Sequence, residues 1–419
     1  MKSTWQLAWH RVCDEDRCMT QPPSGSPARD EWDLLLELRD TPRLLDIVAQ
    51  ATGNELAIQT QLRRGYSDRL VRGAFALCEL RRRAAAKFSR GAEMWFDRQG
   101  LEQATSESVA RHKARRFSGN VLDLCSGIGG DCLALAQTCR VTAVDSNPVA
   151  GLRTQWNSEI YGVGSQVTIE CADVAATELR GTLVHIDPDR RAQAGGRAVR
   201  VEDYAPGLEF LQRLAREGSG GAIKLGPASN FGGKFRDVEI ELVSLDGECK
   251  EATIWFGELR GRQSWRATVL PSGETVAAEP LEFAADICPP LQYVYDPDPA
   301  VVRAGLVDAV AVQLGLSRLD EAEEYLTGTE PIQSGFVQAF EVLAELPNNS
   351  SEIRKHFRTS KFGQVEIKCR HIPIEVESIR RRLPLPGSES GVLIFARVAG
   401  KARALICRRP ECSHSRSAR

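Results

Sequence analysis

VLDLCSGIGGDCLALA (121–136), followed by VTAVD (141–145), decides the fold of this chain. The apolar run VLDL has the length of a strand, and three glycines and an apolar stretch of helical length follow it. Glycines between a strand and a helix let the backbone approach a ligand closely, because they carry no Cβ atom. VTAVD predicts a second strand that ends at Asp145, 22 residues after Asp123. A carboxylate at that place commonly holds a ribose diol, so the two stretches predict a nucleotide-cofactor site.

The spacing of the glycines separates two kinds of cofactor. The dinucleotide fingerprint GxGxxG is not met, because Cys132 stands where the third glycine would follow Gly127 and Gly129. Asp123 lies four residues before the first glycine and suits a cofactor with an amino group, such as S-adenosylmethionine. A glycine-rich turn can also be only a tight turn, and Asp145 can simply cap the next helix. The ordered set of strand, glycines, helix, strand and acid favours cofactor binding.

The same alternation of strands and helices continues over residues 118–262, the predicted cofactor-binding core. The expected elements are strands at 167–171, 183–187 and 222–226, helices at 131–138, from Pro148 and at 203–216, and hairpins around Asp246-Gly247 and over 264–279. Short apolar strands that alternate with helices predict an α/β fold with a parallel sheet covered on both faces.

The remaining residues form predicted segments on either side of this core. Leu70, Ala74, Leu77 and Cys78 share one face of a helix in the N-terminal part. The expected divisions are a disordered polar tail (1–30), a helical domain (31–117), a connector of β-hairpin and helices (263–330), a small α/β domain (331–409) and a loose tail (410–419). Within the last two folded segments we expect helices near 299–314 and 334–344 and strands near 364–369, 391–398 and 402–408.

Composition is that of a soluble globular protein, with 42% hydrophobic and 26% charged residues. The beginning MKSTWQLAWH lacks the apolar run of a signal peptide, and no stretch has membrane-spanning length. We therefore expect a cytoplasmic protein without a membrane partner. The twelve cysteines form no CxxC pair and no zinc-finger spacing, so no metal site is predicted.

Charge is distributed unevenly along the chain. Residues 63–90 hold nine Lys and Arg against two acids, and residues 353–409 hold fourteen against four. Between them, residues 237–330 carry nineteen acids against six bases. One basic run is usually a solvated helix face, whereas two basic ends around an acidic stretch favour an anionic partner.

These motifs carry a resemblance to a known family. DLCSGIGGD (123–131) resembles the first motif of class I S-adenosylmethionine-dependent methyltransferases, above all that of trimethylguanosine synthase-like RNA methyltransferases. The stretch 94–117 is similar to their entry segment, with Thr105-Ser106-Glu107 in place of Thr-Pro-Glu. KFSRGAEMWF, DPDRR, YVYDPDPAVVRAG and residues 362–409 resemble a bacterial group that adds a C-terminal THUMP-like domain. The resemblance implies a Rossmann-like methyltransferase core, an N-terminal helical domain and a small α/β THUMP-like domain.

The resemblance also assigns roles around the cofactor S-adenosylmethionine. Asp123 and the backbone of Gly127 and Gly129 would contact its methionine part, and Asp145 its ribose. Cys125, which departs from the family's motif but is small, would line the same loop. Asp173, in CADV (171–174), would face the adenine amino group, although it can also be a helix cap or turn residue.

DPDRR (187–191) follows the fourth predicted strand, at the sheet edge where ligands bind. In amino methyltransferases an Asp-Pro-Pro-aromatic motif there accepts the substrate amine, so Asp187 and Pro188 are the candidate catalytic residues. Arg190 and Arg191 replace the second proline and the aromatic, and could bind a phosphate or carboxylate or stack on a base. Alternatively Asp187 caps a helix and the arginines lie on a solvated loop. Lys224, in the fifth strand, faces the pocket or covers apolar surface.

Three functions are compatible with these residues. The leading hypothesis is a cytoplasmic methyltransferase that acts on RNA, on a base nitrogen, with Lys368, Arg370 and Arg380 to Arg382 supplying charge for RNA docking. A second keeps the cofactor but takes a small anionic metabolite or a protein as acceptor. A third is a catalytically inactive RNA-binding protein that has kept the fold.

Overall fold

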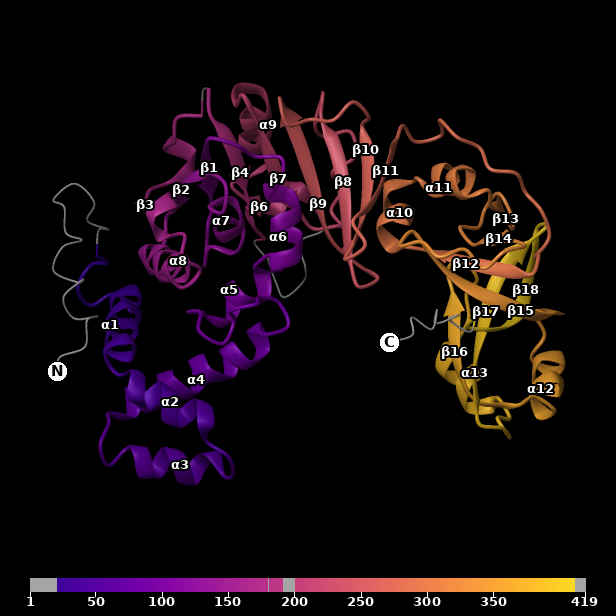
Figure 1. Cartoon of the computed structure of the whole chain (residues 1–419), viewed down its shortest axis with the longest axis horizontal. Coiled ribbons are helices and arrows are strands. Elements are labelled where there is room, and N and C mark those ends of the chain that lie inside the picture. The colour runs from indigo at the N-terminus through magenta and orange to yellow at the C-terminus, as the bar shows by residue number, and fades with distance from the viewer. Residues whose placement is uncertain (1–20, 180, 191–199, 411–419) are drawn as a thin grey trace, which may run out of the picture. The chain divides into compact units, whose positions relative to one another are not determined.

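The computed structural model describes residues 21–179, 181–190 and 200–410 (Figure 1). The chain forms two compact units. The first comprises Met1–Val238 and Ile254–Arg260, and the second comprises Glu239–Thr253 and Gly261–Arg419. Among the described residues, no helix has both the length and the apolar character needed to cross a membrane.

The first unit begins with a helical part, as predicted. Its helices are α1 (Pro27–Asp40), α2 (Pro42–Gln50), α3 (Glu55–Leu62), α4 (Asp68–Ala84), α5 (Arg98–Gln103) and α6 (Glu107–Ala114). Side chains of Ser26, Asn54 and Ser67 accept backbone N–H bonds at the starts of α1, α3 and α4. The predicted face of α4 is buried, and it shares a core with Trp95 and Trp156, whose rings lie 4.8 Å apart. This contact joins the helical part to the cofactor-binding core.

A parallel sheet forms the centre of the first unit, which confirms the predicted fold class. Its strands are β1 (Asn120–Leu124), β2 (Arg140–Asp145), β3 (Val167–Cys171), β4 (Leu183–Ile186) and β7 (Gly220–Leu225), with helices α7 (Gly130–Leu135), α8 (Pro148–Ile160) and α9 (Leu208–Glu217). These five strands lie in the order β7-β4-β1-β2-β3. The chain leaves β1 toward β2 and β3 and later returns to β4 on its other side. Ligands bind at such a reversal, beyond the carboxyl ends of the strands.

The predicted helix at 203–216 starts later, at Leu208. Tyr204–Ala205 forms the short strand β6, which pairs with β5 (Asp189–Arg190). Pro206 follows directly, and a residue before proline is biased away from helical backbone angles. The segment after the DPDRR motif is therefore tied to the motif itself by strand pairing.

Two hairpins open the second unit, where both were predicted. β8 (Glu239–Leu245) and β9 (Glu248–Gly257) flank Asp246 and Gly247, and β10 (Trp265–Leu270) pairs with β11 (Glu274–Ala278). Asp246 and Gly247 have φ angles of 53° and 77°. Two successive positive φ angles are typical of the tight turns that match the twist of a hairpin.

The second unit also contains a mostly antiparallel sheet of seven strands, in the order β13-β14-β12-β15-β18-β17-β16. Its elements are β12 (Tyr293–Pro297), α10 (Pro299–Ala304), α11 (Val307–Leu314), β13 (Ser317–Arg318), β14 (Leu326–Gly328), β15 (Val337–Pro347), α12 (Ser350–Arg358), β16 (Phe362–Cys369), α13 (Val376–Arg382), β17 (Glu389–Val398) and β18 (Lys401–Arg408). Both α12 and α13 contribute to one apolar cluster with this sheet. The three predicted C-terminal strands are confirmed.

The predicted helix near 334–344 is wrong, because residues 337–344 belong to β15 and no helix covers 334–336. That strand pairs antiparallel with β12 on one side and β18 on the other. VQAFEVLAEL is rich in good helix formers, so local preference favoured a helix. Pairing with two neighbouring strands overrides that preference, and short apolar runs do not separate the two states by periodicity.

Candidate functional site

A cavity of about 620 Å³ lies at the carboxyl ends of β1, β2 and β4 in the first unit. The predicted site residues that line it are Asp123, Cys125, Gly127, Asp145, Asp173, Asp187 and Pro188. Gly129 lies beneath the loop rather than in the lining. For Arg190 only the backbone is described, in β5, and Arg191 lies outside the described residues.

The glycine loop is shaped by left-handed backbone angles. Gly127 and Gly129 have φ angles of 55° and 89°, and Cys125 adopts 57° without being glycine. A Cβ atom on Gly127 would meet no protein atom within 4 Å, so the backbone of this residue is open to the cavity that it lines. A Cβ on Gly129 would lie 3.0 Å from Thr154 Cγ2, which shows close packing of α8 under the loop. Glycine is therefore needed at 127 for conformation and at 129 also for space.

Asp145 ties the end of β2 to this loop. Its Oδ2 accepts the N–H of Gly127 at 2.9 Å, and its Oδ1 accepts the N–H of Asn147 at 2.8 Å. Burial raises the pKa of Asp145, although both backbone hydrogen bonds act in the opposite direction. Asp145 does not cap α8, because the cap is Asn147, whose side chain accepts the N–H of Val149 at 3.0 Å. The carboxylate of Asp145 instead lines the cavity and holds the glycine loop.

Asp173 is exposed at the rim of the cavity. Its Oδ1 accepts the N–H of Ala175 at 2.9 Å and caps a short 3-10 helix, Val174–Ala176. The capping role considered from the sequence is thus present. Its position in the lining is also compatible with a contact to the cofactor's base.

Asp123 is fully buried at the end of β1. Its Oδ1 lies 2.7 Å from His185 Nδ1, and its Oδ2 has no hydrogen-bond partner among the described residues. Burial raises the pKa of Asp123, and the contact with His185 counteracts the rise. A buried carboxylate oxygen without a partner is costly, so it points to a ligand group that donates to it.

A chain of buried polar groups continues behind His185. Lys113 Nζ lies 3.5 Å from His185 Nε2 and 2.9 Å from Asp131 Oδ1, and the Thr105 hydroxyl donates to Asp131 Oδ2 at 2.6 Å. Burial acts to raise the pKa of Asp131, but the nearby cations, Lys113 first, lower it below its usual range. The sequence analysis missed this chain. The available signal was a histidine inside the apolar strand LVHI, where a polar residue needs partners.

Asp187 lies beyond β4, and Lys224 of β7 pairs with it. Lys224 Nζ is 2.5 Å from Asp187 Oδ2 and donates to the carbonyl of Gln103 at 3.2 Å. The Lys224 side chain is 5% exposed and that of Asp187 is 29% exposed. Lys224 therefore directs its ammonium to the cavity's acid, rather than only covering apolar surface.

Helix α5 closes the same side of the cavity. Gly100 packs against the glycine loop so tightly that a Cβ atom there would lie 2.5 Å from Ile128 Cγ2. The Gln103 side chain donates to Asp189 Oδ1 at 3.1 Å. The helical part thus supplies walls to the cavity that the sequence analysis attributed only to the core.

Comparisons with known proteins agree with this geometry. Residues 118–194 match the family described as RNA cap guanine-N2 methyltransferase, and residues 337–409 match the family described as THUMP domain-like. Two relatives, from two strains of Mycobacterium tuberculosis, are each 33% identical over 345 residues, which is 78% of this chain and 94% of theirs. Both are called uncharacterized S-adenosylmethionine-dependent methyltransferases. The chain belongs to the S-adenosylmethionine-dependent methyltransferases.

A solved structure shows that the methyltransferase shares its architecture beyond the core. A candidate methyltransferase from Porphyromonas gingivalis W83 superposes with a TM-score of 0.70 at 19% identity, over 91% of this chain and 99% of that one. At this identity the likeness concerns the fold alone. It extends over both units, including the C-terminal THUMP-like domain.

The cavity suits the methyltransferase's cofactor, S-adenosylmethionine, which is a cation at its sulfonium and carries an ammonium group. Eight acids line the cavity: Glu31, Asp97, Asp123, Asp131, Asp145, Asp173, Asp187 and Asp189. Among the described lining residues the one Lys or Arg is Arg153, and its guanidinium is paired with Glu31 and Asp97. Negative potential in a cleft raises the local concentration of a cationic ligand.

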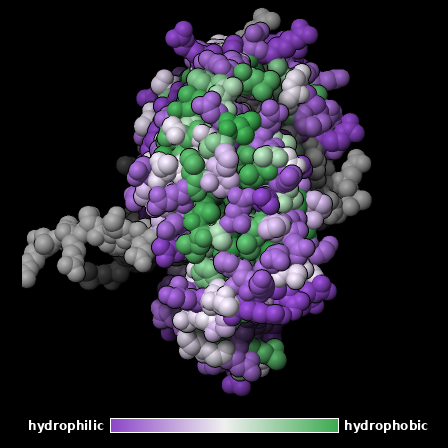
Figure 2. Space-filling model, turned by 90° about the vertical axis from the view of Figure 1, so that its right-hand side faces the viewer, coloured by the Kyte–Doolittle hydropathy of each residue, from purple (hydrophilic) through white to green (hydrophobic). Residues whose placement is uncertain are grey.

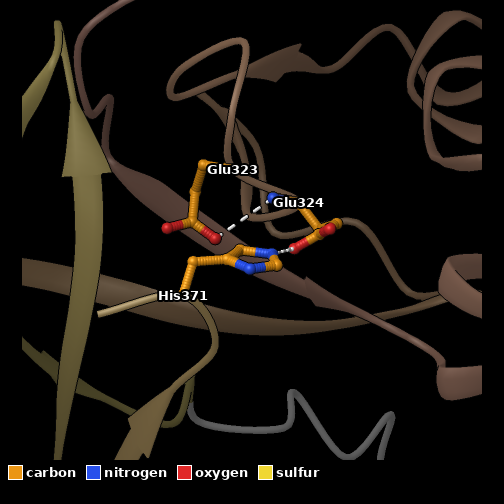
Figure 3. Close-up of side chains that lie close together, drawn as sticks. All are labelled: Glu323, Glu324 and His371. Carbon is orange, nitrogen blue, oxygen red and sulfur yellow. Dashed lines mark hydrogen bonds and ion pairs between the residues drawn. The ribbon is translucent and has the colours of Figure 1, made fainter. Parts of the chain in front are cut away.

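One cluster of potential metal ligands occurs in the described part of the chain, in the second unit. Glu323, Glu324 and His371 bring one ligand atom each within 4.8 Å of one another (Figure 3). Glu323 is fully buried, but its oxygens accept the N–H groups of Arg397 at 2.9 Å and Glu324 at 3.1 Å. Glu324 pairs with His371. These bonds show that the cluster has a structural role, because they join the loop at 320–324 to the β17–β18 hairpin.

Proposed function

We propose that this methyltransferase methylates an exocyclic amino group of a base in RNA. The observation that carries the proposal is the position of Asp187. It follows β4, next to the strand that carries Asp123, and it lines the same cavity. An amine bound by Asp187 would therefore lie beside the methionine end of the cofactor.

Bound S-adenosylmethionine supplies the electrophilic methyl group. Asp187 would accept one N–H of the acceptor amine and so direct the nitrogen lone pair at the methyl carbon. A neutral amine need not lose a proton before attack, and positioning then provides most of the rate enhancement. Transfer would form the C–N bond at the expense of the cofactor's C–S bond, and Asp187 would accept the proton that the methylated nitrogen then loses. Lys224, whose Nζ lies 2.5 Å from Asp187 Oδ2, would hold the carboxylate in the correct orientation.

The acidic lining bears on the alternative of a small anionic acceptor. A carboxylate or phosphate inside the cavity would meet eight acids with few cations to offset them. A neutral base amine avoids this repulsion, while the phosphates of an RNA can remain outside. Arg190 and Arg191, directly after the lining residue Asp189, are proposed to bind such a phosphate at the rim.

An exposed basic surface in the THUMP-like domain supports RNA docking. It is formed by α12, α13 and the segment between α12 and β16. Its exposed bases without an ion pair among the described residues are Arg354, Lys355, Arg358, Lys361, Arg381 and Arg382. On the face shown in Figure 2, hydrophilic residues flank a band of hydrophobic ones. Clustered cations of this kind bind phosphates without reading sequence.

Other predicted cations are engaged within the protein. Lys368 and Arg370 both pair with Asp296, at 2.9 and 2.6 Å, and Arg380 pairs with Glu377 at 2.7 Å. In the N-terminal basic run, Arg63 and Arg72 pair with Asp68. The proposal therefore places RNA docking on α12 and α13 rather than on every basic run of the sequence.

Transfer of a labelled methyl group to total RNA from cells that lack this gene tests the proposal. We expect incorporation by the wild type and at least a hundredfold loss in Asp187→Asn, with less than a twofold change in the Kd of S-adenosylmethionine. Asp189→Asn is the matched control, because this acid lines the same cavity but bonds Gln103. Label that appears only in small molecules or protein would overturn the RNA assignment. Equal loss in both variants would overturn the role of Asp187.

RNA docking is tested separately by salt dependence. Arg381→Ala combined with Arg382→Ala should weaken RNA binding and lower the slope of log K against log salt by about 1 to 2. Arg403→Ala serves as the control, because Arg403 in the same domain is paired with Glu345 at 2.8 Å. An unchanged slope in the double variant would exclude this surface as the docking site.

A further inference from the structure

We propose that the buried chain Thr105–Asp131–Lys113–His185–Asp123 is a positioning device for the cofactor's amino group, in which His185 holds the carboxylate of Asp123 and Lys113 holds the imidazole of His185. The inference rests on the proposed role of Asp123 and adds residues that neither the motif nor the comparisons assign. His185 lies on β4, opposite Asp123 in the sheet register. Lys113 comes from α6 and Asp131 from α7. The elements β1, β4, α6 and α7 thus each contribute a residue to the chain.

The geometry selects one tautomer of His185. Lys113 Nζ, which can only donate, faces Nε2 at 3.5 Å, so this nitrogen acts as the acceptor. The ring proton is then on Nδ1 and is donated to Asp123 Oδ1 at 2.7 Å. Asp131 Oδ1 lies 3.8 Å from the same Nε2, so both members of the Lys113–Asp131 pair face this nitrogen. His185, Lys113 and Asp123 are each 1% exposed, so water does not offer a substitute partner.

One of the two acids of the chain has no Lys or Arg partner among the described residues. Asp131 pairs with Lys113 at 2.9 Å, whereas Asp123 contacts only the imidazole of His185, at 2.7 Å. The other groups facing the chain are the Phe117 ring, whose centroid is 6.4 Å from that of His185, and the Cys132 thiol of α7, whose pKa is raised by burial. Asp187 lies further along the cavity and is already paired with Lys224. An ammonium group at Asp123 Oδ2 would complete the set, since a buried charge needs a partner.

This arrangement predicts that only ligands with an amino group depend on the buried chain. S-adenosylmethionine and S-adenosylhomocysteine carry the amino group that Asp123 would bind. 5′-Methylthioadenosine shares the adenosine and the sulfur but lacks the amino acid. A defect in the chain should therefore weaken the first two ligands and spare the third. A general structural defect of the pocket would weaken all three.

The test is calorimetric titration of the full chain with S-adenosylhomocysteine and 5′-methylthioadenosine. His185→Leu should weaken S-adenosylhomocysteine by roughly tenfold, as expected for loss of a hydrogen bond to a charged group, and 5′-methylthioadenosine by less than twofold. His185→Asn should recover most of the affinity, because its amide nitrogen takes the place of Nδ1. If His185→Leu does not fold, His185→Gln replaces it, since its amide reaches toward Nε2 instead.

Each result of these titrations either supports or overturns the positioning role of the buried chain. Equal weakening of both ligands, or no weakening of either, overturns the positioning role. Asp123→Asn separates this failure from that of the underlying assignment. If Asp123→Asn weakens S-adenosylhomocysteine selectively while His185→Leu does not, only the chain's role is lost. If Asp123→Asn binds S-adenosylhomocysteine like the wild type, the assignment of Asp123 itself fails.

Discussion

Two buried acids, Asp123 at the end of β1 and Glu239 at the start of β8, show how differently one residue class can be used. Both side chains are at most 2% exposed. Glu239 has both oxygens occupied, by the Gly261 N–H at 2.6 Å and by the Arg266 guanidinium. Asp123 has one oxygen bonded to His185 and one without a partner at a cavity. Burial of charge therefore does not mark a site by itself, whereas an unfinished hydrogen-bond set beside a cavity does.

The largest expected effect comes from breaking the buried pair behind Asp123. Asp131→Asn leaves Lys113 buried without its counter-charge and should lower the free energy of unfolding by about 3 to 5 kcal/mol at neutral pH. Because the folded-state pKa of Asp131 is lowered, its contribution is present above the ordinary value of 3.8 and is lost as pH falls below it. Denaturant unfolding of both proteins at pH 7 and near pH 3 checks this. A difference that stays constant over this range would contradict it.

Neutralising the two compared acids should separate affinity from stability. Asp123→Asn is expected to weaken S-adenosylmethionine by roughly ten- to a hundredfold, because a charge-assisted bond to the ammonium is lost. Glu239→Gln should lower the free energy of unfolding by about 1 to 3 kcal/mol and leave the Kd of the cofactor unchanged. Calorimetry and thermal unfolding of both variants provide the measurements. A cofactor defect in Glu239→Gln would remove the distinction between the two acids.

A smaller effect is expected in the glycine loop. Gly127→Ala introduces a Cβ at a φ of 55°, where a non-glycine residue costs on the order of 1 kcal/mol. No protein atom obstructs this Cβ, so any further loss must come from the ligand's side. We expect a decrease in melting temperature of a few degrees together with a larger loss of cofactor affinity. A stability loss without an affinity loss would place Gly127 outside the binding surface.

The smallest effect is expected from charged pairs on the surface of the seven-stranded sheet. Glu341 and Arg408 lie opposite each other on β15 and β18 and form an ion pair at 2.7 Å. Their side chains are 23% and 47% exposed, so solvent and salt screen the pair. Glu341→Gln should change the free energy of unfolding by about 0.5 kcal/mol, and less in 0.5 M salt. A change in the free energy of unfolding as large as that of Glu239→Gln would show that surface ion pairs stabilise the fold as much as buried ones.

The sequence analysis succeeded where the signal is local. The strand, glycine loop and acid of residues 121–145 are consecutive, so their order alone predicted the parallel core and its cavity. Hairpin strands around Asp246-Gly247 are specified by the turn itself. β15 could not be predicted in this way, because two partner strands rather than its own residues determine its state.

Interactions between distant segments account for the rest of what was missed. Lys113 and His185 are 72 residues apart, and the family resemblance assigned no role to either of them. The acidic and basic stretches seemed to indicate an anionic partner, yet Asp296 of the acidic stretch neutralises Lys368 and Arg370. Charges separated along the chain are thus partly joined in space. The exposed bases of α12 and α13 without an ion pair are the basic residues that stay available to an anionic partner.

The bond between Asp145 and the Gly127 amide has a thermodynamic consequence for the cofactor. The loop is already held in its left-handed shape by Asp145, Thr154 and Asn157, the last two donating to the carbonyls of Gly127 and Ile128. Its conformational entropy has therefore been given up during folding rather than at the moment of association. A preorganised loop of this kind lets more of the contact free energy appear as affinity. It also implies rapid association without a slow loop-ordering phase, because the backbone that receives the cofactor is already in place.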